Sequence, residues 1–379
     1  MATYLLALKP LGPAVFRAPG DATAAAHGPA VGSPGLQQPP PSSIAGTLAS
    51  IALRQGLCSL EELRDCRAKA LGLDPEECTR QGVADDFCNI HLCLRRLLGR
   101  GYRLYTGLAV AESRLLVYTA KGYLPPESLH CLARKDEHED NKCAVPPCRG
   151  AEDGSRRGDR DGCREALKAA LRPQTLTRTG VALAPASKTA REGLLYTQPE
   201  TSLQASAAYA AIAVADGVPR LPPVAKLGAE NRAAALHVEP LNEEPWRLLL
   251  HGSEHCRQWL LVLASPALLD DTPWSSTVTL TPGAAEKLAQ MLLGGSLEYR
   301  LLKLEVPKTQ PGLELAAPGW CTPRNSPRRP MLHVPAGTTI VLEASYNTVK
   351  TIVARGVGLN TKQGWGTVAA TCIDKEKHQ

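Results

Sequence analysis

The stretch R-G-V-G-L-N-T-K-Q-G-W-G-T-V, from Arg355 to Val368, contains four glycines in two pairs, G-V-G and G-W-G, separated by five residues. Glycine adopts positive φ angles and lets another backbone approach closely, and successive amide groups in such a loop can bind an anion. Arg355 and Lys362 add positive charge, and Trp365 offers a flat aromatic face. The other interpretation is a tight hairpin whose glycines occupy bulges.

The composition is typical of a folded protein with a mild positive charge. The 379 residues are 44% apolar and carry a formal net charge of +6, which permits an anionic partner without requiring one. Aromatic residues make up only 4%, so we expect any nucleic-acid contact to depend on backbone amides, Arg and Lys. No run of eighteen apolar residues occurs, and the first apolar segment is broken at Pro10. The sequence therefore predicts a cytoplasmic protein with no membrane partner.

The pattern of short apolar runs and amphipathic segments favours an α+β fold, because strands and helices intermix without a regular βαβ alternation. The expected strands are 4–9, two within 102–120, 180–185, 193–198, 246–251, 258–264, 297–305 and 338–343. The expected helices are one beginning at Ser42 or Ser43 and ending at Gly56, then 59–71, 86–98, 203–215 and 283–293.

Four further segments lead to a family resemblance. They are K-P-L-G-P-A-V-F-R with Q-Q-P-P-P-S-S-I-A-G-T-L (9–17 and 37–48), G-V-A-L-A-P-A-S-K-T-A-R-E-G-L-L-Y-T (180–197), L-G-A-E-N-R-A-A (227–234), and P-G-W-C-T-P-R-N-S-P-R-R-P-M-L-H-V-P-A-G-T-T-I-V-L-E (318–343). Together with the paired glycines, and in this order, they resemble the RAMP superfamily of CRISPR proteins. Within that superfamily they look like one member in particular, the Cmr-complex subunit that holds the five-prime handle of the guide RNA in type III-B effectors.

The resemblance implies two RRM-like modules of the ferredoxin type, βαββαβ, with long inserted loops. We expect the first module over 1–175, with a charged, Cys-containing insertion at about 130–164, and the second over 176–379. The family is non-catalytic and uses no cofactor. Its partners are the five-prime handle of the crRNA, the large polymerase-like subunit and the backbone RAMP subunit.

The resemblance and the local chemistry together give a set of expected RNA-binding residues. Basic side chains and glycine amides would contact phosphates, and Ser42 and Ser43 would do so at a helix N-terminus if they are not simply caps. The expected residues are Arg17, Ser42, Ser43, Lys188, Arg191, Arg328, Arg329, Arg355, Gly356, Gly358, Lys362, Gly364, Trp365 and Gly366.

Two alternatives remain open from the sequence. Some RAMP proteins cleave precursor crRNA without a metal, and here His27 and Lys121 are the crude candidates for such chemistry, whereas His91 fits a packing role. The insertion also contains cysteines that free thiols, a disulfide or zinc would each explain, although the resemblance predicts no metal. These are Cys131, Cys143, Cys148 and Cys163.

Overall fold

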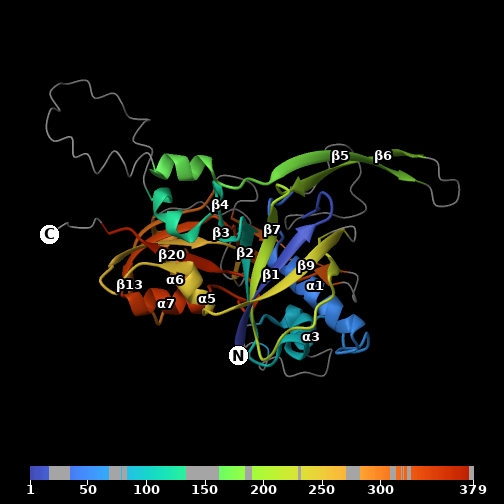
Figure 1. The fold of residues 1–379 in the computed structure, drawn as a ribbon, viewed down its shortest axis with the longest axis horizontal. Helices are drawn as coiled ribbons and strands as arrows, with labels where there is room; N and C mark the ends of the chain where they lie inside the picture. Colours follow the sequence, from blue (N-terminus) through green and yellow to red (C-terminus); the bar gives the residue numbers. More distant parts are fainter. Residues whose placement is uncertain are drawn as a thin grey trace, which may run out of the picture.

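The computed structural model contains two main sheets, both mostly antiparallel, that pack against each other (Figure 1). It describes residues 1–16, 35–67, 78, 83–133, 162–183, 190–228, 232–269, 282–307, 313–316, 318, 320–321 and 326–374. One cluster of buried side chains includes Ile212 from the first sheet and Leu261 from the second, so the two sheets share a core. The α+β class expected from the sequence is confirmed.

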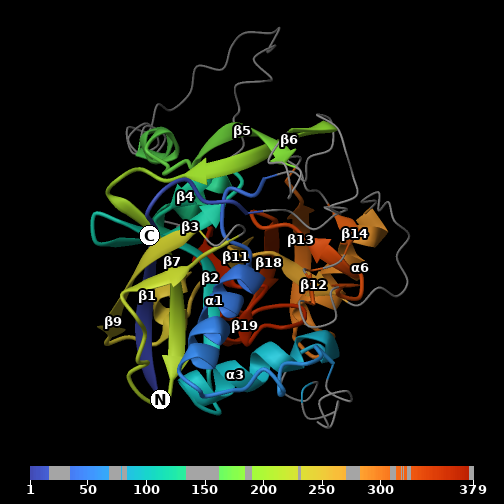
Figure 2. The same ribbon diagram turned by 90° about the vertical axis from the view of Figure 1, so that its right-hand side faces the viewer.

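The first sheet has the order β4-β3-β2-β7-β1-β9-β8. Its strands are β1 (Ala2–Pro10), β2 (Arg103–Ala111), β3 (Arg114–Thr119), β4 (Gly122–Leu124), β7 (Ala207–Ala215), β8 (Val224–Lys226) and β9 (Ala233–Leu241). Helices α1 (Pro41–Arg54) and α3 (Cys88–Leu98) cover one face, and in Figure 2 they lie in front of the sheet. Ile44 and Leu48 of α1 pack there against Tyr4 and Leu6, which alternate with less buried residues along β1.

The order of four of these strands is that of a ferredoxin-type module. β7 lies between β1 and β2 and is antiparallel to both, and β9 pairs antiparallel with the other edge of β1. β1, α1, α3 and β2 therefore form a split βαβ unit. Between β7 and β9 the described residues contain the short strand β8 where a second helix would be expected.

The second sheet has the order β10-β20-β11-β18-β13 and gives the complete βαββαβ order. Successive elements are β11 (Gln258–Leu263), α6 (Pro282–Leu293), β13 (Tyr299–Glu305), β18 (Thr339–Ala344), α7 (Tyr346–Arg355) and β20 (Val368–Cys372). β11 is central, with β18 and β20 antiparallel on its two sides. The short strand β10 (Leu250–His251) extends the sheet beyond β20.

The remaining strands form smaller sheets. The longest pair is β5 (Gln174–Leu183) with β6 (Ala190–Ser202), a two-stranded hairpin that extends away from the body in Figure 1 and is joined to it by a bridge between Thr201 and Ala14. The others are β12 (Ala267–Leu269), β14 (Glu314–Ala316) and β17 (Met331–Val334) in one sheet, β15 (Trp320–Cys321) with β16 (Ser326–Pro327), and β19 (Gln363–Gly364), which joins β2. Short helices are η2 (Asp85–Phe87), η3 (Pro126–Leu132) and α5 (Pro245–Leu249).

Three sequence-based element predictions are wrong. The segment expected as helix 203–215 is the strand β7, because pairing with β1 and β2 on both edges outweighs the helix propensity of its alanines. The segment expected as strand 246–251 is mostly the helix α5, which begins at Pro245, a favourable first helical residue. Residues 59–67 form turns and bends rather than a helix, and 68–71 lie outside the described residues. The helix α7 was not expected.

The strands do not divide at residue 175 as the sequence suggested. β7 and β9 both follow that position, yet they pair with β1 at the centre of the first sheet. The first module therefore continues to Leu241, and most of the expected insertion, residues 134–161, lies outside the described residues. Among the helices that the structure describes, none has the length and apolar character to cross a membrane.

Candidate functional site

The glycine-rich stretch lies where the two sheets meet. It begins at the end of α7, continues through β19 at the edge of the first sheet, and leads into β20 of the second. The carbonyl of Gly364 accepts hydrogen bonds from the hydroxyls of Thr106, on β2, and Ser265, just after β11, each at 2.7 Å. The stretch therefore connects the modules as well as ending one of them.

All four glycines have positive φ, from +63° at Gly366 to +88° at Gly364. A Cβ at Gly366 would lie 1.8 Å from the carbonyl oxygen of Val357, and one at Gly358 would lie 2.5 Å from that of Leu268. Both distances are far shorter than any van der Waals contact, so backbone packing itself requires glycine here. The glycines therefore serve packing, but not in the tight hairpin considered from the sequence, because the stretch runs from α7 to β20 through β19, which pairs in parallel with β2.

The expectation that the glycine amides form an anion nest is wrong. Each of these amides already donates to a backbone carbonyl oxygen, at 2.8 to 3.2 Å. The acceptors for Gly356, Gly358, Gly364 and Gly366 are, respectively, Ile352, Leu292, Thr361 and Pro266. An amide that already donates inside the protein has no proton left for a phosphate. Any role of the glycines in RNA binding must therefore be indirect, through the shape of the loop.

The expectation that Trp365 presents an open face is also wrong. Its side chain is 2% exposed and packs in a small core with Leu268 and Met331. The rings of Phe87 and His333 meet it edge to face, at centroid distances of 6.3 and 6.0 Å. No base can stack on Trp365 in this conformation.

Cationic side chains do surround the loop. Arg355, the last residue of α7, is exposed, and Lys362 is half-buried with its Nζ 6.0 Å from the centroid of the Tyr102 ring. Arg103 begins β2; its Nη1 donates to the carbonyl oxygen of Arg355 and, at 3.3 Å, to the hydroxyl of Thr361. We name Arg95, Arg103, Arg355 and Lys362 the cationic cluster.

The members of the cationic cluster are close enough to repel one another. Burial lowers the pKa of Lys362, and the neighbouring charges of Arg103 and Arg95 lower it further. Burial is likewise the main cause of the lowered pKa of Arg103, to which the charge of Arg355 contributes. An anion bound among these groups would be stabilised by all of them.

Arg95 and Arg103 were missed in the sequence analysis. The available signal was the density of arginines in R-R-L-L-G-R-G-Y-R, residues 95–103. The first four of these residues belong to the expected helix 86–98, and no binding role was assigned to them. Strand β19 brings this segment to the glycine loop, since Gln363 and Gly364 pair with Leu104 and Tyr105. That parallel pairing joins residues about 260 positions apart and has no sequence signature.

Four other expected residues, Ser42, Ser43, Arg328 and Arg329, are not part of this cluster. Ser42 and Ser43 lie in the first turn of α1, whose N-cap is Pro40, and neither caps the helix. Arg328 is 5% exposed, with its guanidinium 4.3 Å from the centroid of the Phe87 ring, whereas Arg329 is exposed. Arg191 lies in β6.

Five candidates remain. Three of them lie outside the described residues: Arg17, His27 and Lys188. Lys121 is an exposed residue in the turn between β3 and β4. His91 is 4% exposed, with Nδ1 2.8 Å from the Tyr102 hydroxyl, so its expected packing role is confirmed.

Ten of the twelve cysteines form disulfides, and Cys143 and Cys148 lie outside the described residues. The pairs are Cys58–Cys93, Cys66–Cys321, Cys78–Cys88, Cys131–Cys163 and Cys256–Cys372. For the insertion cysteines the sequence left free thiols, a disulfide and zinc open. In the structure Cys131 and Cys163 form a disulfide. Cys88 and Cys93 are fully buried, and each is bonded to a different cysteine.

Comparisons with known proteins find one family model and several solved structures that this chain resembles. The family model described as CRISPR-associated protein (Cas_Cmr3) matches residues 157–372. A chain of the cryo-EM structure of the Type III-B Cmr-beta bound to cognate target RNA and AMPPnP aligns with TM-score 0.52 and 15% identity, over 97% of this chain and 99% of its own. A chain of Cmr-beta bound to cognate target RNA aligns with TM-score 0.49 and 14% identity, over 89% of this chain and 86% of its own.

A search of curated proteins finds no match. The structural likeness establishes the shared fold, and the family model spans more than half of the sequence. The chain therefore belongs to the CRISPR-associated Cas_Cmr3 family.

Proposed function

We propose that this protein is a non-catalytic RNA-binding subunit of a type III-B CRISPR effector complex, where it clamps the five-prime handle of the crRNA in antiviral defence. Its family and its fold support a place in such a complex. In the same proposal it links the large polymerase-like subunit to the backbone RAMP subunit. The similar Cmr-beta chains come from assemblies bound to target RNA.

The cationic cluster is the observation that carries the RNA-binding part of the proposal. It joins α3, β2, α7 and the glycine loop, so it exists only when both modules are folded against each other. A guanidinium donates two parallel hydrogen bonds to a phosphate, and a phosphate between these groups would relieve their mutual repulsion. We expect binding to raise the lowered pKa values of Lys362 and Arg103.

The β5–β6 hairpin is the second surface that we assign to RNA or a neighbouring subunit. It forms a two-stranded sheet that is bridged to the body at the end of β6, between Thr201 and Ala14, and it extends beyond the body of the protein (Figure 1). The side chains from Gln174 to Arg178 are exposed, and Lys188 and Arg191 belong to the same segment of the sequence. Arg17 and Arg329 remain proposed contacts of the handle.

The experiment uses the purified full chain and a labelled RNA that carries a repeat-derived five-prime handle, with a scrambled RNA of equal length as the control. Binding and cleavage are read from the same reactions, with and without the neighbouring subunits. We expect a handle-dependent shift with the RNA left intact. Cleavage at one site would instead assign a metal-independent endoribonuclease, and equal binding of both RNAs in the assembled complex would contradict the handle assignment.

A further inference from the structure

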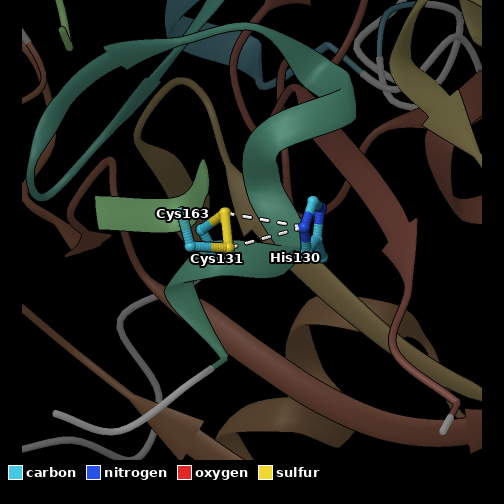
Figure 3. A group of neighbouring side chains, drawn as sticks. All are labelled: His130, Cys131 and Cys163. Carbon is cyan, nitrogen blue, oxygen red and sulfur yellow. Dashed lines mark hydrogen bonds between the residues drawn. A yellow bond between two sulfur atoms is a disulfide. The ribbon is translucent and has the colours of Figure 1, made fainter. Parts of the chain in front are cut away.

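A histidine and two cysteines meet beside the core that the two sheets share, to which Leu129 of η3 belongs (Figure 3). Cys131 lies in the last turn of η3 and Cys163 lies in the helical turn over 162–168, and the two residues are 4% and 7% exposed. Nε2 of His130 lies 3.5 Å from each of the two sulfur atoms. The cysteines form a disulfide in this conformation.

The imidazole is oriented by a backbone group. Nδ1 of His130 is 2.8 Å from the carbonyl oxygen of Glu127. A carbonyl only accepts hydrogen bonds, so Nδ1 carries a proton, and in the neutral ring Nε2 holds the lone pair that faces the sulfur atoms. Histidines that ligate metals are held in this way, with the second ring nitrogen donating to a carbonyl or carboxylate.

The spacing also fits a soft divalent cation. In a tetrahedral zinc site with Zn–N and Zn–S bonds of about 2.0 and 2.3 Å, the nitrogen and each sulfur are about 3.5 Å apart. The His130 nitrogen already lies at that distance from both sulfur atoms. Only the two sulfurs would have to move, from the bonded separation to about 3.8 Å.

We propose that His130, Cys131 and Cys163 form a redox-controlled zinc site, which is a disulfide when oxidised and binds Zn²⁺ when reduced. A dithiol reductant supplies two electrons and two protons, becomes a cyclic disulfide and leaves two thiols. Zn²⁺ then displaces both thiol protons and is bound by two thiolates and the His130 nitrogen. The fourth position is open to water.

The position of the site gives it a structural consequence. Cys131 and Cys163 are 32 residues apart and border the segment 134–161. Both the disulfide and the zinc site would hold the two ends of that segment together, so the base of the insertion stays closed in either redox state.

The chain contains a matched control. Cys256 and Cys372 also form a disulfide, with Asp374 close to them. The carboxylate of Asp374 already accepts from the amides of Arg257 and Gln258, at 2.6 and 2.7 Å, and the group contains no imidazole. We therefore expect weaker metal binding at this second pair.

The test uses the full chain, reduced and freed of metal, and then titrated with Co²⁺ as a spectroscopic substitute for Zn²⁺. We expect thiolate-to-cobalt charge transfer that persists in Cys256→Ser/Cys372→Ser and is lost in Cys131→Ser/Cys163→Ser. His130→Ala keeps both thiols and should weaken Zn²⁺ binding at least about tenfold, measured by competition with a chromophoric chelator.

A second readout distinguishes loss of the site from loss of the fold. Zn²⁺ should protect Cys131 and Cys163 from alkylation in the wild-type chain, whereas Cys256 and Cys372 react at the same rate with and without the metal. Equal protection of both pairs, or Zn²⁺ affinity unchanged in His130→Ala, would overturn the proposal.

Discussion

At the scale of single residues, the glycines of the last loop are needed for packing rather than for binding. Gly366 has φ of +63° and meets the carbonyl oxygen of Val357 with no room for a side chain. We expect Gly366→Ala to lower the free energy of unfolding by at least about 3 kcal/mol, since it combines a strained backbone with a steric clash.

The matched control is Gly46 in helix α1, where an added Cβ would meet nothing within 4 Å. We expect Gly46→Ala to raise the free energy of unfolding by about 0.5–1 kcal/mol, because alanine restricts the unfolded chain. Denaturant unfolding with intact disulfides measures both variants. An equal effect of the two would show that the close approach at Gly366 has no energetic consequence.

His333 makes a residue-scale prediction about pH. Burial lowers its pKa from 6.5 to about 4, although a hydrogen bond to the carbonyl of Met331 acts in the opposite direction. Because the unfolded chain binds the proton more tightly, His333 contributes stability above pH 6.5 that is lost as the pH falls toward 4. The loss should reach about 3 kcal/mol.

The measurement compares wild type with His333→Phe, which keeps a ring but does not titrate. Between pH 7 and about pH 4, we expect the free energy of unfolding to fall by about 3 kcal/mol more in wild type than in the variant. Parallel pH profiles for the two proteins would contradict the buried, neutral state of His333.

Residue roles were only partly predictable from the sequence. Positive charge at Arg355 and Lys362 was recognised, but the burial of Trp365 and Arg328 depends on Phe87, which comes from a distant part of the chain. Sequence patterns give residue types and spacing, whereas exposure is decided by long-range packing.

At the scale of elements, local signals and tertiary pairing disagree most at β7 and α7. The alanine-rich segment of β7 favours a helix, but two neighbouring strands fix it as a strand. Conversely, α7 contains Val349, Ile352 and Val353, whose branched side chains lower helix propensity. They form its buried face, and Ser345 caps the helix by accepting from the amide of Thr348. β1, α1, α3, β11, α6 and β18 were predicted from their apolar patterns, whereas β9 and β20, which complete the two main sheets, were not.

The disulfides make an element-scale prediction, because they tie together elements at very different sequence separations. Cys66 and Cys321 are separated by 255 residues, and Cys78 and Cys88 by 10. In the chain-entropy description, the longer loop stabilises by about 5 kcal/mol and the shorter by about 3 kcal/mol. We therefore expect Cys66→Ala/Cys321→Ala to cost more stability than Cys78→Ala/Cys88→Ala.

Denaturant unfolding of the two double variants, without reductant, checks this order. Alkylation of the denatured wild-type chain under the same conditions should modify at most Cys143 and Cys148, the two cysteines outside the described residues. Modification of all twelve cysteines would contradict the disulfides.

At the scale of the whole molecule, the two ferredoxin-type sheets explain why the chain needs both modules to form a site. Arg95 and Arg103 belong to the first module, Arg355 belongs to the second, and the glycine loop connects them. The α+β class was predictable from the sequence, whereas the extent of the first module was not. Its strands β7 and β9 follow the long insertion, and strand pairing over such separations leaves no local pattern.

The measurement that tests the central claim most directly is the salt dependence of handle RNA binding. It compares wild type, Arg355→Ala/Lys362→Ala, and the control Arg300→Ala/Lys303→Ala, which removes equal charge from the edge strand β13. A charge-keeping variant, Arg355→Lys/Lys362→Arg, tests whether the effect is electrostatic.

We expect Arg355→Ala/Lys362→Ala to bind handle RNA more weakly than wild type. The slope of log K against log salt should become less steep by about 0.7 for each phosphate contact removed. The control and the charge-keeping variant should retain a slope close to that of wild type. An unchanged slope in Arg355→Ala/Lys362→Ala, with wild-type affinity, would contradict the assignment of the cationic cluster to RNA.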